Sequence, residues 1–350
     1  MATLPNHPLV ESVYAWRKAT TPQGHRAHLG ASLIGDGCRR KLWYVFRHCQ
    51  AADFDGRMLR LFNTGHLAES RFTEELRGIG CDVWEVDPKT GKQIHIELFG
   101  GHFSGSLDCI AKARSDTIAH AYMGGKPHVT EFKTHGEKSF KKLQAEGVMT
   151  AKVQHYAQMQ VYAHLMKLER WLYMAVNKNT DELHIERGHT DHKCAEYMID
   201  KAKFIIESQT PPEGISDDQT WYQCRFCDFN ETVCHGKKLP EVNCRTCLHS
   251  TPDTENGRWS CARHEQWVDE GMVCGEVDHL FIPALVPLEQ IDAGEDWVSY
   301  DLDGVEIKNG KGGYASKELQ HAIANPAVIN DANVNALREG LGATLCGAWQ

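Results

Sequence analysis

The 350-residue chain has no uninterrupted apolar run of about 18 residues, the length that a membrane-crossing helix needs. Its first residues do not combine a basic stretch with an apolar one, so no secretory signal peptide is predicted. It also has no glycine-rich loop ending in Gly-Lys-Ser/Thr, which excludes a P-loop motor within the sequence. We therefore expect a protein of the reducing cytoplasm that has no membrane partner.

Positive charge is also scarce. The chain has 38 Lys and Arg against 47 Asp and Glu, a net charge of −9, which argues against a generic polyanion binder. The charge is uneven, because residues 1–50 carry seven basic and two acidic side chains, whereas residues 281–350 carry four and ten. An acidic total can therefore conceal a basic surface, and net charge does not decide the function.

Cysteine, by contrast, is abundant, with 13 residues. Disulfides are rare in a reducing compartment, so this number of cysteines favours metal ligation. The remaining composition is that of an ordinary globular protein, with 41% hydrophobic and 24% charged residues, which excludes a largely disordered chain.

Three sections differ in their sequence pattern. Residues 1–235 alternate helix and strand patterns, which predicts an α/β (α+β) domain with a mixed β-sheet flanked by helices. Residues 236–285 are rich in Cys, His and Gly and have few apolar residues, which predicts a small metal-stabilised domain. Residues 286–350 are interpreted as an acidic tail with weak helical patterns at 315–325 and 332–340.

Apolar spacing predicts the elements of the first section. Helices are expected over residues 37–48, 56–79, 150–169 and 191–208. Strands are expected over residues 82–86, 93–98, 102–111, 128–133, 171–176 and 182–187, with a glycine-rich loop at 123–126. The last two strands are expected to form a hairpin or an edge pair.

Charged residues stand on two strands that we expect to be buried. Asp108 lies within the strand 102–111, and Glu131 and Lys133 flank Phe132 on the next strand. Residues two apart in a strand share a face, so Glu131 and Lys133 project together. Carboxylates on adjacent strands form a hard-oxygen site for Mg²⁺ or Mn²⁺, and a lysine beside them can stabilise charge on a phosphate.

Two of the expected helices carry further polar pairs. His66 and Glu69 lie three residues apart, on one helix face. Gln158 and Tyr162 lie four apart, opposite an apolar stripe. Such a face can bind phosphates or order the lysine.

In chain order, the segments GHLAE, GSLD, EFK and QMQVY resemble the motifs of the PD-(D/E)XK nuclease superfamily. The resemblance covers residues 30–235 and is closest to RecB-type exonucleases and to the iron–sulfur nucleases of CRISPR adaptation. It implies a restriction-endonuclease-like fold. It also implies that Asp108, Glu131 and the backbone carbonyl of Phe132 bind Mg²⁺ or Mn²⁺, and that Lys133 is the catalytic lysine.

The same resemblance assigns roles to the two helices. His66 is implied as an auxiliary metal ligand, with Glu69 supporting it. Gln158 and Tyr162 match the family's Q-x3-Y motif. Two features depart from the family pattern, because no proline precedes Asp108 and the spacing from Asp108 to Glu131 is long.

Cys224, Cys227 and Cys234 form a C-x2-C-x6-C set that needs a fourth ligand, for which Cys38 is the candidate. One distant cysteine with three clustered ones resembles the [4Fe–4S] pattern of the family's iron–sulfur branch. Zinc bound by these cysteines, or by three of them and His235, is the alternative. The basic run after Cys38 is either beside the DNA path or an ordinary solvated helix end: Arg39, Arg40 and Lys41.

A second set, Cys244, Cys247, Cys261 and Cys274, has the spacing C-x2-C-x13-C-x12-C. A C-x2-C knuckle with a second pair is typical of structural zinc. We expect zinc here in a ribbon-like domain, with Cys274 as the fourth ligand and His264 as the alternative.

These features predict a metal-dependent deoxyribonuclease of exonuclease type that acts in DNA recombination, repair or replication, as in a phage or mobile element. DNA is the expected partner, and a separate helicase or recombination protein is considered because the chain has no P-loop motor. The alternative is a non-catalytic iron–sulfur or zinc scaffold that binds nucleic acid. An iron–sulfur redox protein is disfavoured, because the sequence has no flavin or nicotinamide fingerprint.

Overall fold

The computed structural model describes residues 7–236, 238–268 and 278–345. Their contacts divide the chain into two compact units. The first unit holds the described residues up to 24, together with 28–36 and 52–204. The second holds 25–27, 37–51 and the described residues from 205 onward, so the section boundaries expected at 235 and 285 both fall inside it.

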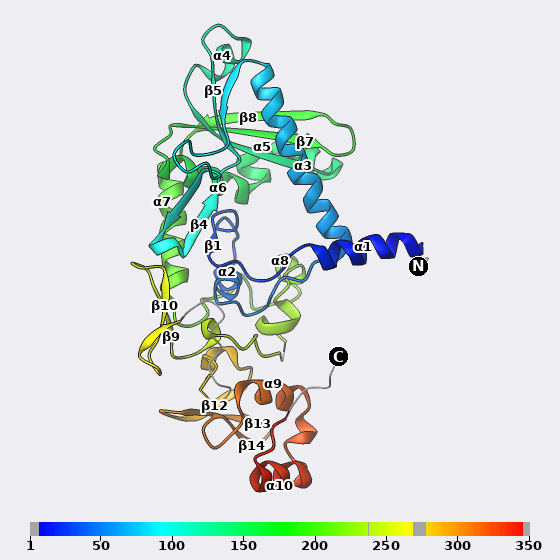
Figure 1. Cartoon of the computed structure of the whole chain (residues 1–350), viewed down its shortest axis with the longest axis vertical. Coiled ribbons are helices and arrows are strands. Elements are labelled where there is room, and N and C mark those ends of the chain that lie inside the picture. Colours follow the sequence, from blue (N-terminus) through cyan, green and yellow to red (C-terminus); the bar gives the residue numbers. More distant parts are fainter. Residues whose placement is uncertain (1–6, 237, 269–277, 346–350) are drawn as a thin grey trace. The chain divides into compact units, whose positions relative to one another are not determined.

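A five-stranded mixed β-sheet forms the centre of the first unit (Figure 1). Its order is β2-β5-β6-β7-β8, in which β6 and β7 run parallel and the other neighbouring pairs run antiparallel. The strands are β2 (Cys81–Trp84), β5 (Cys109–Ala113), β6 (His128–His135), β7 (Arg170–Asn177) and β8 (Leu183–His189). β6 is therefore the central strand.

Helices cover both faces of this sheet. On one face, Leu172 and Met174 of β7 share a buried cluster with Phe72. On the other face, Trp171 and Tyr173 share a buried cluster with residues of two further helices. The first face carries α3 (Gly56–Gly78) and α4 (Ile118–Met123), and the second carries α5 (Glu137–Ala151) and α6 (Val153–Leu165). A sheet buried on both faces explains the apolar run of β7, and the expected mixed α/β class is confirmed.

The other elements of the first unit include a small three-stranded sheet. Its strands are β1 (Leu29–Gly30), β4 (Phe103–Ser106) and β3 (His95–Leu98), in that spatial order, and η1 (Phe99–Gly101) joins β3 to β4. The helices α1 (Pro8–Thr20) and α7 (His192–Glu207) also begin in this unit. No helix in the described ranges is long and apolar enough to cross a bilayer.

The expected strand over 102–111 is wrong, because the chain changes sheets within it. β4 pairs in the small sheet and β5 in the large one. Asp108 therefore lies in a bend directly before β5, not inside a strand. Apolar alternation continues across this change of partner, so the sequence pattern did not reveal it.

The sequence prediction missed the helices α1, α4 and α5. The expected helix over 150–169 begins at Val153, and α5 precedes it, with a non-helical Gly147 (φ 72°) inside its range. A glycine in that conformation interrupts the apolar periodicity from which a helix is predicted. α4 precedes the expected loop and reaches only its first residue, Met123; the helix is capped by Gly124, whose φ of 69° is the left-handed conformation of a helix C-cap.

The second unit combines short helices with two antiparallel sheets. One sheet contains β9 (Ser250–Asp253), β10 (Arg258–Cys261) and β11 (Gln266–Val268), and the other contains β12 (Glu289–Gly294), β13 (Trp297–Leu302) and β14 (Val305–Gly310). The helices are α2 (Arg39–Phe46), α8 (Tyr222–Arg225), α9 (Ser316–Ala324), α10 (Ala332–Leu341), and the short turns η2 (Asn230–Cys234), η3 (Cys244–Thr246), η4 (Pro283–Leu285) and η5 (Pro326–Val328).

The acidic last section contains more structure than a tail. The weak helical patterns at 315–325 and 332–340 are confirmed by α9 and α10, whereas the three strands β12 to β14 were not predicted. Val298, Tyr300 and Ile307 of these strands share a buried core with Leu319 of α9. Their charged outward-facing residues concealed the strand alternation.

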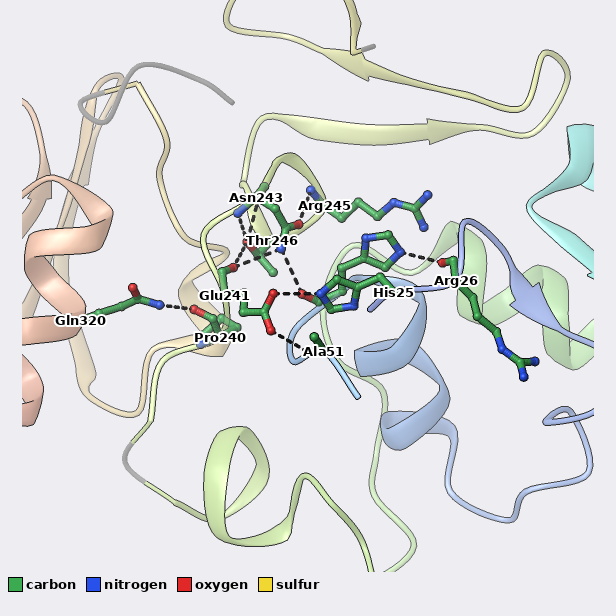
Figure 2. Close-up of polar contacts among 10 residues, drawn as sticks. His25, Arg26, Ala51, Pro240, Glu241, Asn243, Arg245, Thr246 and Gln320 are labelled. Carbon is green, nitrogen blue, oxygen red and sulfur yellow. Dashed lines mark hydrogen bonds and ion pairs between the residues drawn. The ribbon is translucent and has the colours of Figure 1, made fainter. Parts of the chain in front are cut away.

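Within the second unit, Glu241 joins segments that are distant in sequence (Figure 2). Its carboxylate accepts the Ala51 N–H at 2.5 Å and contacts His25 Nε2 at 2.8 Å. Its backbone carbonyl accepts the Thr246 hydroxyl at 2.7 Å. These contacts hold residues 25–27, the end of the 37–51 segment and the loop before η3 in one network.

Candidate functional site

Glu131 and Lys133 lie together on the central strand β6, as their spacing predicts. The Lys133 ammonium donates to Glu131 Oε1, and also to the Phe132 carbonyl at 3.1 Å. Glu131 is fully buried, with 0% exposure, whereas Phe132 packs on the opposite face in the cluster with α3. The alternation of the strand therefore separates a polar pair from the apolar core.

Asp108 reaches the same place from the bend before β5. Its Oδ2 accepts the Phe132 N–H at 2.7 Å, which fixes the carboxylate against the β6 backbone. The two acids Asp108 and Glu131 therefore stand beside each other, although 22 residues lie between them in sequence.

The electrostatics of this pair follow from burial and from the neighbouring charges. Burial and the nearby Asp108 carboxylate raise the pKa of Glu131 to about 7, although Lys133 opposes this shift. Burial lowers the pKa of Lys133, but Glu131 and Asp108 outweigh it, and the net shift is upward. The lysine is therefore charged, and the acid pair is a place where added positive charge is favourable.

Helix α6 supplies two side chains that orient Glu131. Gln158 Nε2 donates to Glu131 Oε2 at 3.1 Å and to the Tyr162 hydroxyl at 3.3 Å. Gln158 and Tyr162 are 5% and 1% exposed, so they are not a solvated helix face. Gly105 makes room for this arrangement, because a Cβ there would lie 2.4 Å from Tyr162 Oη.

Helix α3 brings Glu69 toward the acids. Burial and the Asp108 carboxylate raise the pKa of Glu69, which shows that the two carboxylates are close enough to interact. His66 Nδ1 lies 3.3 Å from Glu69 Oε1, but its side chain is 75% exposed. The structure thus connects His66 to the centre through Glu69, while its role as a metal ligand stays a prediction.

The donor atoms of this centre fit a hard divalent cation. Asp108, Glu131 and the Phe132 carbonyl present oxygen atoms, the ligand type that Mg²⁺ and Mn²⁺ prefer. No group of three or more His, Cys, Asp and Glu side chains in the described part of the chain is arranged to hold a metal by itself. Mg²⁺ commonly binds through one or two carboxylates and completes its shell with water and substrate phosphate.

The first cysteine set lies within the second unit. Burial, Cys38 and Cys234 raise the pKa of the Cys224 thiol, and Cys38 and Cys234 also contribute to the raised pKa of Cys227 after burial. The four thiols therefore lie in one neighbourhood, although no three of them are arranged to hold a metal in the described residues. Two backbone N–H groups point at these sulfurs, from Lys41 to Cys38 Sγ at 3.4 Å and from Phe229 to Cys227. The donor chemistry fits a thiolate-bound metal or cluster.

The second cysteine set is described only in part, because Cys274 lies outside the described residues. Burial dominates the raised pKa of Cys247, and Cys261 and Cys244 add to it. The N–H groups of His249 and Leu280 donate to the Cys247 sulfur and oppose that shift. The alternative ligand, His264, has its Nε2 3.8 Å from Asp278.

The basic run after Cys38 begins helix α2. Arg40 donates from Nε to the Pro212 carbonyl at 2.9 Å and from Nη1 to Cys234 Sγ at 3.9 Å. Arg39 is exposed, and Lys41 is half-buried. Arg40 is therefore attached to the first cysteine set, and the DNA contact predicted for all three residues stays a prediction.

The sequence prediction missed a polar cluster that continues along strand β6 from Glu131 and Lys133. His135 Nε2 and His155 Nδ1 lie 2.9 and 2.8 Å from the Tyr173 hydroxyl. Tyr173 pairs with Glu131 in the register of β6 and β7. The signal that could have revealed this cluster is the spacing, since His135 is two residues after Lys133 on the same strand face.

No protein-family model and no curated protein matches this chain. The crystal structure of SSO0001 matches with a TM-score of 0.38 and 15% identity, over 64% of this chain and 95% of that chain. The alkaline exonuclease LHK-Exo from Laribacter hongkongensis matches with a TM-score of 0.35 and 12% identity, over 56% and 90%. The same exonuclease in complex with dAMP gives a TM-score of 0.31 at 12% identity. At these TM-scores the likeness carries no functional assignment, and the geometry of the site must do so.

Proposed function

We propose that this chain is a metal-dependent deoxyribonuclease of the exonuclease type, with Mg²⁺ or Mn²⁺ as its cofactor. The observation that carries the proposal is the convergence of Asp108, Glu131 and Lys133 in one unit. Glu131 is a buried carboxylate with a raised pKa beside Asp108, which favours a cation, and the charged Lys133 favours an anionic substrate. A scaffold that only binds nucleic acid has no need of such a pair.

Different residues of the chain have different roles in the proposed phosphodiester hydrolysis. The divalent cation, when bound, supplies positive charge to the phosphate oxygens and lowers the pKa of the attacking water. Asp108, Glu131 and the Phe132 carbonyl would hold it. Lys133 stabilises the negative charge that develops on the phosphate, and Gln158 keeps Glu131 in position for both partners.

We also propose resident metals for the two cysteine sets. Cys38, Cys224, Cys227 and Cys234 are proposed to hold a [4Fe–4S] cluster, with zinc as the alternative. Their interacting thiols and the N–H groups aimed at two of the sulfurs support this proposal. Zinc is proposed for Cys244, Cys247 and Cys261, with Cys274 or His264 as the fourth ligand.

The proposed substrate is DNA, in recombination, repair or replication. Arg39, Arg40 and Lys41 are proposed to contact its phosphates. Their support is their position on α2 beside the first cysteine set, where a bound cluster would hold them in place.

The test compares two DNA substrates. Protein purified without oxygen is incubated with Mg²⁺ or Mn²⁺ and either end-labelled linear DNA or closed circular DNA. We expect nucleotides to be released from the linear ends while the circle stays intact. Cutting of the circle would show an endonuclease instead, and no cleavage of either substrate would overturn the proposal.

A lysine pair provides the matched control. Lys133→Met is expected to abolish cleavage, because the positive charge at the phosphate is removed. Lys112→Met removes an exposed lysine from the neighbouring strand β5 and should leave cleavage unchanged. Equal activity of the two variants would show that Lys133 does not act on the substrate.

A further inference from the structure

A second group of polar side chains, one of them a lysine, lies next to the proposed catalytic lysine, in the same unit. It is built where three elements end: His135 at the end of β6, Ser139 in the first turn of α5, and Lys152 between α5 and α6. The Lys152 ammonium donates to Ser139 Oγ, and Ser139 Oγ lies 3.4 Å from His135 Nδ1. The three side chains therefore form one connected hydrogen-bonded row.

Contacts with the buried Tyr173 hydroxyl fix the position of this row. His135 Nε2 contacts the Tyr173 hydroxyl at 2.9 Å, and His155 Nδ1 contacts the same hydroxyl at 2.8 Å. The two imidazole rings lie nearly parallel, with centroids 5.9 Å apart and an interplanar angle of 21°. Tyr173 is fully buried, so the position of His135 is fixed by the core of the sheet.

The surroundings of the row are cationic. Burial and then the positive charges of Lys152, Lys133 and Lys178 lower the pKa of His135 to about 4. Nearby carboxylates are already engaged, since Glu137 pairs with Lys141 at 2.6 Å and Glu186 accepts the Val148 N–H at 2.9 Å. Among the described residues, no carboxylate forms an ion pair with Lys152.

We propose that Lys152, Ser139 and His135 form a phosphate-binding subsite for the phosphate next to the one that Lys133 contacts. The inference rests on the proposed function, because it extends the same substrate path. Residues 133 and 135 share a face of β6 and are about 7 Å apart along the strand, which is comparable to the spacing of neighbouring phosphates. The shared ligand chemistry is a phosphate group, either an internal phosphodiester or a terminal phosphate.

The experiment removes the charge either from Lys152 or from one phosphate of the DNA. DNA affinity is measured by fluorescence anisotropy before any Mg²⁺ or Mn²⁺ is added, for the wild type and Lys152→Gln. One set of oligonucleotides carries a single neutral methylphosphonate that is moved along the strand, and a second set ends in a phosphate or a hydroxyl. We expect that replacing one particular phosphate of the DNA weakens binding by the wild type about tenfold. The same replacement should not weaken binding by Lys152→Gln any further.

The two sets distinguish the two sources. If the affinity difference between the wild type and Lys152→Gln disappears when one internal phosphate is replaced by a methylphosphonate, the subsite binds an internal phosphodiester. If the difference disappears when the end phosphate is replaced by a hydroxyl, the subsite binds a terminal phosphate. If every phosphate replacement in the DNA weakens binding by the wild type and by Lys152→Gln equally, the proposed subsite is overturned. Lys112→Gln, on the exposed side of β5, should behave like the wild type. Ser139→Ala should reproduce the effect at the same position and serves as the second variant if Lys152→Gln lowers the melting temperature.

The outcome separates this inference from the proposed function. Coupling between Lys152 and one phosphate in a protein that fails to cleave DNA would support the subsite and overturn the nuclease. Cleavage in Mg²⁺ without any such coupling would support the nuclease and overturn the subsite.

Discussion

A single carboxylate, Glu131, connects most of the chemistry at the residue scale. One of its oxygens accepts from Lys133 and the other accepts from Gln158 at 3.1 Å. A buried carboxylate that lost one of these donors would be poorly positioned for a cation, since buried polar atoms without a partner are costly.

Gln158→Leu tests this dependence. Removing the amide leaves Glu131 Oε2 without its donor from α6, so we expect cleavage to require more Mg²⁺ and to slow by about 10- to 100-fold. The measurement is the cleavage rate as a function of Mg²⁺ concentration. Gln154→Leu, one turn earlier on the exposed side of α6, is the control. An unchanged Mg²⁺ dependence in Gln158→Leu would show that Gln158 does not position the acid.

Strand alternation revealed the Glu131–Lys133 pair from sequence, because two residues on one strand obey a fixed geometry. The sequence prediction gave Glu69 only a supporting role beside His66 and did not include His135. Their proximity to Asp108 and to Tyr173 depends on how separate elements pack, and spacing in the sequence does not specify it.

At the scale of elements, the close approach of β4 to α6 positions Tyr162. A Cβ on Gly105 would lie 2.4 Å from Tyr162 Oη and 2.8 Å from Ala31 Cβ. Such distances are shorter than any packed carbon can tolerate, so glycine is required for β4 to lie where it does.

Gly105→Ala should therefore destabilise the first unit by about 1–3 kcal/mol, because the added methyl group overpacks the contact with Tyr162. Gly65→Ala is the matched control. Gly65 lies inside α3 with nothing within 4 Å of its ideal Cβ, so alanine there should stabilise the helix by up to about 1 kcal/mol. Urea unfolding of both variants measures the effects. A Gly105→Ala variant as stable as the wild type would contradict the packing account.

Long periodic elements could be predicted at this scale, and interrupted ones could not. The long helix α3 and the antiparallel pair of β7 and β8 are confirmed. Gly147 hides α5, and the change of sheets at Leu107 and Asp108 divides what reads as one strand. Both errors arise because the decisive event is a local backbone change or a tertiary pairing.

For the whole molecule, the chain consists of two units, and the cysteine sets lie in the second. Cys38 comes from the segment 37–51, whereas its proposed partners follow residue 205. A metal that binds all four would restrict the unfolded chain over a long loop, and its binding energy would add to the stability of this unit.

Metal analysis tests this proposal. Protein purified without oxygen is expected to contain iron and acid-labile sulfide together with zinc. Cys224→Ser should lose the iron and sulfide and unfold at a lower temperature, whereas Cys194→Ser, outside both sets, should keep them. Zinc alone in the wild type would replace the cluster by the zinc alternative, and absence of both metals would refute the proposed resident metals.

The central claim is that Asp108, Glu131 and Lys133 form a metal-dependent centre for DNA hydrolysis. The most direct measurement is the single-turnover rate of cleavage of end-labelled linear DNA in Mg²⁺ by the wild type and by Glu131→Gln, with Glu97→Gln on the exposed side of β3 as control. The account predicts cleavage by the wild type and by Glu97→Gln, and a loss of at least about 100-fold in Glu131→Gln. Cleavage by Glu131→Gln at the wild-type rate would contradict it.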